Sequence, residues 1–119
     1  MKKLLIASTI TVLTLTSVVS APKAQAENIA QSICEYVAAD DKKRMRSFLK
    51  TNKLKIRRIF DGIQCNGQNL LEFASTSGSV ETGSLMIGKL PKKVVSDNLA
   101  ALQTGSQPLI DAANERVSS

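Results

Sequence analysis

The sequence predicts an all-α fold: a small domain of three to five short helices in antiparallel pairs, preceded by an N-terminal signal-peptide helix. Apolar residues recur at three- and four-residue steps in several short segments, which is the period of an amphipathic helix. Glycine, asparagine, aspartate and proline separate these segments at short intervals and indicate turns. The length of 119 residues allows at most one domain.

The first 26 residues are predicted to be a secretory signal peptide. Lys2 and Lys3 give a basic start, and residues 4–19 form an uncharged apolar stretch rich in threonine and serine. Ala24 and Ala26 then place small residues at the two positions that a signal peptidase inspects. The alternatives are cleavage five residues earlier and an uncleaved anchor, for which the stretch is short. We therefore expect a periplasmic or secreted protein with no stable membrane span after cleavage.

The chain after the signal peptide divides into a helical domain at 27–91 and a tail at 92–119. The tail has a weak apolar pattern and a breaker before its last segment, so we expect it to be weakly ordered or loosely docked. Within the domain, the apolar periodicity and the turn residues predict helices at about 27–39, 41–51, 54–63, 70–76 and 80–90.

The two cysteines, Cys34 and Cys65, are predicted to form a disulfide. An even count in an exported chain indicates pairing, and the alternative is two free thiols. Closing a loop of about thirty residues stabilises a fold by roughly 3–4 kcal/mol on the chain-entropy model. Their spacing is too wide for a C-x-x-C redox motif, and the chain has no histidine to complete a zinc site.

A basic run is the most distinctive surface feature that the sequence predicts. It holds nine bases with no acid between them: Lys42, Lys43, Arg44, Arg46, Lys50, Lys53, Lys55, Arg57 and Arg58. A candidate anion-binding surface comprises seven of them: Lys42, Lys43, Arg46, Lys50, Lys53, Arg57 and Arg58. The alternative is a solvated helix face that keeps a small protein soluble.

Several kinds of chemistry find no support in the sequence. Without histidine there is no Ser-His-Asp triad, and no other motif marks a catalytic residue. Asp40 and Asp41 are interpreted as helix caps and not as a catalytic carboxylate pair. Export, the absence of tryptophan and an aromatic content of 3% argue against nucleic acid as a partner. We expect no catalytic residue, no metal and no cofactor.

The region from Asn66 to Ala74, followed by 78–87, resembles half of an ankyrin repeat. It combines a glycine-led turn, a short helix, a glycine turn and a second helix. It departs from the ankyrin pattern at Leu70, where such repeats usually have proline, and only one copy is clear. The resemblance implies an antiparallel helix pair and no particular function.

A second resemblance covers residues 28–91. Ile33 to Val37, Asp40-Asp41 and Cys65-Asn66-Gly67 are similar to the corresponding pattern of the domain of unknown function 3718 family. This family consists of short exported bacterial proteins, so the resemblance implies a periplasmic protein, most readily of a Gram-negative bacterium. The family has no assigned activity, and the resemblance therefore implies no site residues.

These observations favour a non-enzymatic interaction module of the periplasm that binds an unknown protein partner. An alternative is an envelope-surface binder that uses its basic helix face on lipopolysaccharide or anionic lipid. An enzyme of unknown type is a second alternative. A surface binder is expected to lose affinity steeply as salt rises, whereas an enzyme is expected to have a deep pocket with converging polar groups.

Overall fold

The computed structural model describes residues 21–119, and the predicted signal peptide at 1–26 lies largely outside this range. Within it the chain forms α-helices and one 3-10 helix, and no strand. The elements are α1 (Ala21–Ala38), α2 (Lys42–Thr51), α3 (Ile56–Ile59), η1 (Phe60–Gly62), α4 (Leu70–Ser77), α5 (Val80–Lys89), α6 (Lys92–Asp97), α7 (Leu99–Leu102) and α8 (Gln107–Ser118). The predicted all-α fold is confirmed, with five α-helices before Pro91 and three after it.

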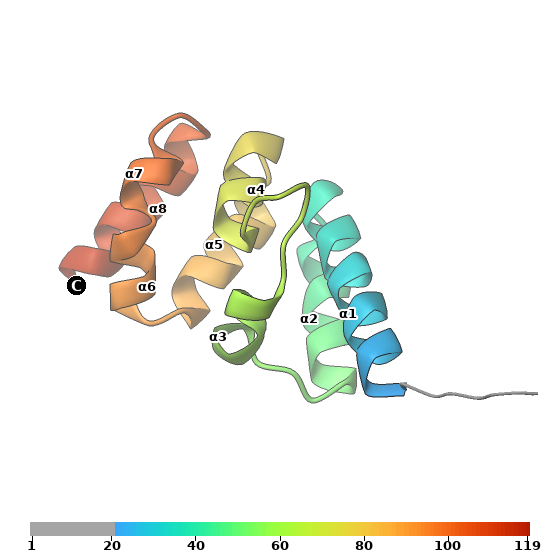
Figure 1. Ribbon diagram of the computed structural model, residues 1–119. Coiled ribbons are helices and arrows are strands. Elements are labelled where there is room, and N and C mark those ends of the chain that lie inside the picture. Colours follow the sequence, from blue (N-terminus) through green and yellow to red (C-terminus); the bar gives the residue numbers. More distant parts are fainter. Residues whose placement is uncertain (1–20) are drawn as a thin grey trace, which may run out of the picture.

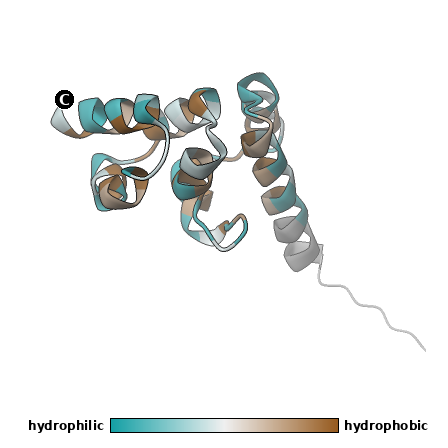
Figure 2. Cartoon of the chain, turned by 90° about the horizontal axis from the view of Figure 1, so that it is seen from above, coloured by the Kyte–Doolittle hydropathy of each residue, from teal (hydrophilic) through white to brown (hydrophobic). Residues whose placement is uncertain are grey.

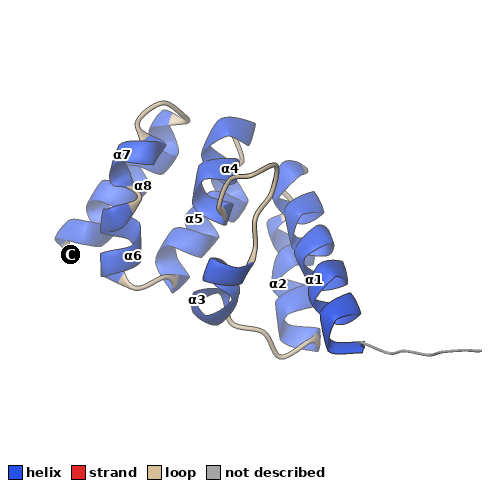
Figure 3. Ribbon diagram, in the orientation of Figure 1, coloured by secondary structure: helices blue, strands red, loops and turns tan. Residues whose placement is uncertain are grey.

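Three helical hairpins stand side by side in the order of the sequence (Figure 1). The first pairs α1 with α2, the second pairs α4 with α5, and the third packs α6 and α7 against α8. The second hairpin lies in the middle, because α4 packs on α1 while α5 packs on both α2 and α8. Helix α3 belongs to the long connection between the first two hairpins and packs against α5 (Figure 3). The predicted antiparallel pairs are therefore present.

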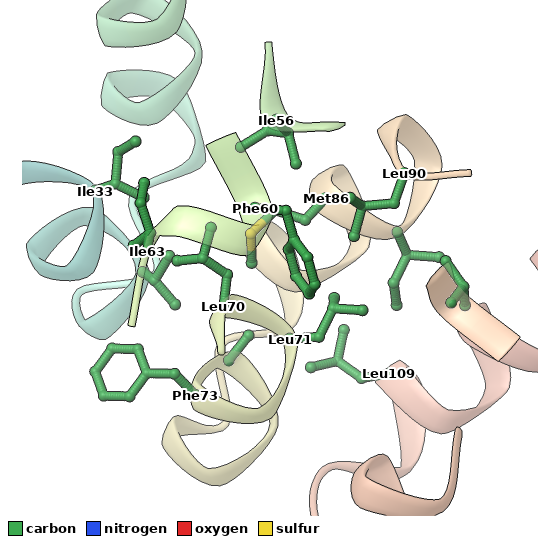
Figure 4. Packing of buried hydrophobic residues seen from close by; sticks show 14 of the residues in the cluster. Ile33, Ile56, Phe60, Ile63, Leu70, Leu71, Phe73, Met86, Leu90 and Leu109 are labelled. Atoms are coloured by element: carbon green, nitrogen blue, oxygen red, sulfur yellow. The ribbon is translucent and has the colours of Figure 1, made fainter. Parts of the chain in front are cut away.

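The hydrophobic core runs through all three hairpins. Most of the helices carry both hydrophilic and hydrophobic residues (Figure 2), so they can turn an apolar side towards the core, whereas α7 consists only of leucine and alanine. Phe60 of η1 lies beside Met86 of α5 in the core (Figure 4), and Leu109 of α8 reaches the same cluster from the third hairpin. Met86 is fully buried and Leu109 is 1% exposed. The domain thus has one continuous core and not a separate one for each hairpin.

The predicted disulfide between Cys34 and Cys65 is present. It joins α1 to the segment that leads into α4, across a sequence separation of 31. Asn66 and Gly67 follow with positive φ angles of 55° and 77°, which makes the tight turn expected there. Because α2 and α3 lie between the two cysteines in the sequence, the disulfide closes a loop that contains both helices.

Asp40 and Asp41 cap two different helices, which the sequence did not indicate. Asp41 caps α2 as predicted, and its carboxylate accepts a hydrogen bond from the backbone N–H of Arg44 at 3.0 Å. Asp40 has a φ of 53°, which turns its carboxylate towards the second hairpin. There it accepts from the backbone N–H of Thr82 at 2.8 Å and of Glu81 at 3.2 Å. It therefore caps the start of α5 and joins the first hairpin to the second.

Helix α4 begins and ends as predicted. Asn69 accepts from the backbone N–H of Glu72 at 2.8 Å, and the Glu72 carboxylate accepts from the backbone N–H of Asn69 at 3.0 Å. This reciprocal arrangement is a capping box. Gly78 ends the helix with a φ of 70°, a conformation that glycine adopts without steric cost.

The residues after Pro91 are packed and helical, in contrast to the weakly ordered or loosely docked tail expected at 92–119. Val95 and Leu102 are fully buried, and the guanidinium of Arg116 donates to the carbonyl of Leu90 at 3.0 Å. Helices α6 and α7 have six and four residues, so the periodic signal of these segments in the sequence is weak. The third hairpin packs on the second hairpin through contacts of α8 with α5 and of α7 with α4.

Candidate anion-binding groove

A groove opens where α2, α3 and the end of α5 meet, with a volume of about 780 Å³. We call it the basic groove and define it by its lining residues: Arg46, Ser47, Leu49, Lys50, Leu54, Lys55, Ile56, Arg57, Gly88 and Lys89. Its volume lies within the range of about 300–1,000 Å³ that is typical of small-molecule sites. Helices α2 and α3 are close in sequence, whereas α5 comes from a distant part of the chain, so the groove is complete only in the folded structure.

The α2 wall carries Arg46 and Lys50, which are four residues apart and therefore share one side of the helix. Two like charges at this spacing destabilise an isolated helix by about 0.2–0.5 kcal/mol. Leu49 lies between them in sequence and is 6% exposed, so it anchors this wall in the core. The sequence of α2 thus directs two cations into the groove at some cost to helix stability.

The α3 wall is positioned by the alternation of its residues. Ile56 is 1% exposed, whereas its neighbours Lys55 and Arg57 are both exposed. Burial of this one isoleucine holds the two bases at the groove on either side of it. Leu54 precedes them and is half-buried, and its backbone N–H donates to the carbonyl of Leu49 at 2.8 Å. This hydrogen bond holds the start of the α3 wall against the end of α2.

The α5 wall consists of Gly88 and Lys89 in the last turn of that helix. Lys89 is exposed, and the next residue, Leu90, is 1% exposed and anchors the end of the helix. Lys89 has a structural role as well, because a cation in a last turn interacts favourably with the negative end of the helix dipole. Lys50 occupies the equivalent position in α2.

The groove is cationic on all three walls. Five of its ten lining residues are basic and none is acidic: Arg46, Lys50, Lys55, Arg57 and Lys89. Among the described residues, none of these five takes part in an ion pair. Charges of one sign that converge on a concave surface attract counter-ions more strongly than the same charges on a convex one. The groove therefore has the electrostatic character of an anion site.

The predicted anion-binding residues divide between the groove and the outer surface. Arg46, Lys50 and Arg57 line the groove, whereas Lys42, Lys43, Lys53 and Arg58 do not. Lys42 instead pairs with Glu81 of α5 at 3.3 Å, so its charge is partly compensated. The path of the chain thus divides the basic run, and only part of the run lines the basic groove.

Sequence reasoning missed the contribution of α5. Lys89 lies far from the basic run in sequence, and no sequence signal indicated that it joins the same surface. Helix α5 contains two glycines, Gly83 and Gly88, and a glycine in a helix can permit close contact with a neighbouring helix. Only Gly83 has that role: a Cβ there would lie 2.6 Å from Leu109 Cδ2, whereas a Cβ at Gly88 would meet nothing within 4 Å.

A smaller hollow of about 260 Å³ lies on the outer side of the first hairpin. Tyr36 and Phe48 border it and pack edge to face, with ring centroids 5.5 Å apart. Both rings are half-buried against the core. The hollow has a single cation, Arg44, which pairs with Asp41 at 3.5 Å. The hollow therefore lacks the convergent charge of the basic groove.

Within residues 21–119 no cluster of three or more histidine, cysteine or acidic side chains is arranged to hold a metal ion. In the same part of the chain, no helix combines the length and the apolar character that crossing a bilayer requires. Among the described residues, we therefore take the basic groove, with its five cations, as the candidate binding site.

The model of a family described as protein of unknown function (DUF3718) matches residues 33–97. The chain belongs to this family. The matched segment contains both disulfide cysteines and all ten lining residues of the groove, whereas α8 lies beyond it. The family resemblance predicted from Cys34, Asp40-Asp41 and Cys65-Asn66-Gly67 is therefore confirmed. No curated protein matches the chain, and no solved structure matches it.

Proposed function

We propose that this member of the family is a non-enzymatic binding module of the bacterial envelope, and that its basic groove holds an anionic partner. One observation carries the proposal: cations from α2, α3 and α5 converge on one concave surface that no acidic residue lines. A solubilising surface has no need to place like charges opposite one another across a groove. The N-terminal signal pattern and the disulfide support export, because disulfides persist in oxidising compartments.

Anionic lipid of the envelope is the first candidate for the partner, and the abundance of phosphate groups there supports it. Phosphate-bearing lipids and lipopolysaccharide are abundant anions there, and each Lys or Arg near an anionic membrane contributes about 1 kcal/mol to binding. The bases outside the groove, including Lys43, Lys53 and Arg58, are exposed and add to a long-range field. A protein partner with an acidic face is the second candidate, supported by the same groove charge.

The test is co-sedimentation of the protein, purified after expression of the full chain, with lipopolysaccharide and with phosphatidylglycerol-containing vesicles. We expect binding at low salt that weakens at physiological salt, because surface charges more than about 8–10 Å apart are screened there. Purely zwitterionic vesicles are the lipid control. An absence of binding to both anionic surfaces at low salt would contradict the envelope function.

Two matched triple variants locate the site. The groove variant carries Lys50→Gln, Arg57→Gln and Lys89→Gln, one substitution on each wall. The control variant carries Lys43→Gln, Arg58→Gln and Lys92→Gln, three exposed bases that do not line the groove. At about 1 kcal/mol for each base, the groove variant should lose about 100-fold in affinity. Equal losses in the two variants would mean that total charge, and not the groove, governs binding.

A further inference from the structure

The basic groove combines charge with apolar surface. Five of its lining residues are cations, and three others have apolar side chains: Leu49, Leu54 and Ile56. Leu54 is half-buried, so part of its side chain remains accessible, whereas Leu49 and Ile56 are anchored in the core. A ligand that fills this groove therefore meets both positive charge and hydrocarbon.

Gly88 keeps the groove open. No heavy atom lies within 4 Å of the position that a Cβ would take there, and its φ lies outside the left-handed region. Neither close packing nor backbone conformation therefore requires glycine at this position. Glycine within a helix lowers helix stability relative to alanine, so folding alone offers no reason for Gly88. Its effect in the structure is to leave space on the α5 wall.

We propose that the basic groove binds the phosphorylated end of a single amphiphile, with the first part of its hydrocarbon chain on the apolar surface around Leu54. This inference rests on the proposed function and specifies the ligand of the same groove. Two of the five cations are arginines, Arg46 and Arg57, whose planar guanidinium groups match the geometry of phosphate oxygens. The three lysines, Lys50, Lys55 and Lys89, add positive charge that does not depend on a fixed bidentate geometry.

The combination of cations and apolar side chains in the groove favours a phosphorylated amphiphile over other classes of ligand. Free inorganic phosphate satisfies the cations but leaves the apolar surface exposed to water. A neutral amphiphile covers the apolar surface but leaves five cations without a counter-charge. A flat anionic membrane provides counter-charge for the cations, but it covers the apolar surface only where one of its lipids enters the groove. Only a molecule with both a phosphate group and hydrocarbon meets both kinds of surface.

Three soluble probes test the ligand class by calorimetric titration of the protein purified after expression of the full chain. The probes are octyl phosphate well below its micelle concentration, inorganic phosphate and octyl glucoside. We expect saturable one-to-one binding of octyl phosphate, and binding of inorganic phosphate weaker by about tenfold or more because the hydrocarbon contact is missing. Octyl glucoside should show no binding. Equal affinity for octyl phosphate and inorganic phosphate would overturn the role of the apolar surface.

A charge-neutral variant tests the place of binding. Gly88→Leu fills the open space while the net charge stays the same, and a leucine is a better helix former than glycine. Ser96→Leu on the exposed side of α6 is the matched control. We expect Gly88→Leu to lose octyl phosphate binding by about tenfold or more, and Ser96→Leu to bind as the unmodified protein. Undiminished octyl phosphate binding by a folded Gly88→Leu would overturn the inference.

The two proposals fail in different ways. If the groove charge variant loses its vesicle binding while Gly88→Leu still binds octyl phosphate, the groove is an anion site, and the amphiphile does not occupy the space beside Gly88. If the groove charge variant and its matched control bind anionic vesicles equally, the proposed function itself fails. Circular dichroism of each variant shows that the fold is retained before either result is interpreted.

Discussion

Two positions on α5, the central helix of the fold, differ in how the chain uses glycine. Gly83 faces the third hairpin, where the side chain of Leu109 occupies the space that a Cβ would need. Gly88 faces the basic groove, where that space is empty. Five residues correspond to a rotation of about 140° around a helix, so the two glycines point to different sides of α5. The same residue type thus permits close packing on one side and an opening on the other.

The difference extends to what holds each side together. The third hairpin is held by apolar packing and by the hydrogen bond of Arg116 to Leu90, and the groove side is enclosed by the loop that the disulfide closes. A packed interface tolerates no added atoms, whereas a groove that binds a ligand must stay open without its walls separating. The molecule therefore stabilises its two sides by different means, and each can be perturbed independently.

Loss of the disulfide is expected to have the largest effect. The Cys34→Ala and Cys65→Ala double variant should lower the free energy of unfolding by about 3–4 kcal/mol, because an open chain of this loop length gains conformational entropy when it unfolds. Urea unfolding followed by circular dichroism measures the loss. Reductant should destabilise the unmodified protein and leave the double variant unchanged. An unmodified protein whose unfolding midpoint does not respond to reductant would show that the bond does not restrain the groove side.

The close contact of Gly105 with α4 is expected to rank next. A Cβ at Gly105 would lie 1.5 Å from Ser75 Oγ and 2.9 Å from the Ser75 carbonyl oxygen, so the turn before α8 has to move. Gly105→Ala should lower the free energy of unfolding by about 2 kcal/mol. Gly62→Ala is the control, because a Cβ there meets nothing within 4 Å. If the two variants unfold at the same denaturant concentration, the third hairpin does not depend on this contact.

The smallest effects provide the most direct comparison of the two sides. Gly88→Ala should raise the free energy of unfolding by about 0.5–1 kcal/mol, because alanine favours the helix and finds open space. Gly83→Ala should lower it by about 1 kcal/mol, because displacement of Leu109 outweighs the same helical gain. Both are measured under identical urea conditions. A common sign for the two changes would contradict the contrast between the packed side and the open side.

The local features of the fold were predictable because their causes are local. Asn69 precedes an apolar helix and has glutamate three residues later, which is the signature of a capping box. Asn66-Gly67 forms a tight turn because both residues tolerate positive φ. The disulfide pairing was predictable because the chain has two cysteines, which allow a single pairing. In each case the residues that decide the structure are neighbours in the sequence or have no alternative partner.

The third hairpin and the Asp40 cap were not predictable in the same way. Val95 and Leu102 are apolar residues in short weak segments, and they are buried only because α6 and α7 pack on α8 and α7 packs on α4. Asp40 lies directly beside Asp41 in sequence, yet its carboxylate binds backbone groups 41 and 42 residues away. A sequence pattern describes one segment at a time and contains no record of which other segment lies opposite.

The sequence by itself determined the all-α class, the helical pairs, the disulfide and the presence of a basic run, because these depend on periodicity, turn chemistry and composition. Only the tertiary structure decided which bases converge. It brings Lys89 to Arg46, Lys50, Lys55 and Arg57, and it pairs Lys42 with Glu81. The physical reason is that a helix fixes the side on which each residue lies, whereas the packing of one helix on another decides what that side faces.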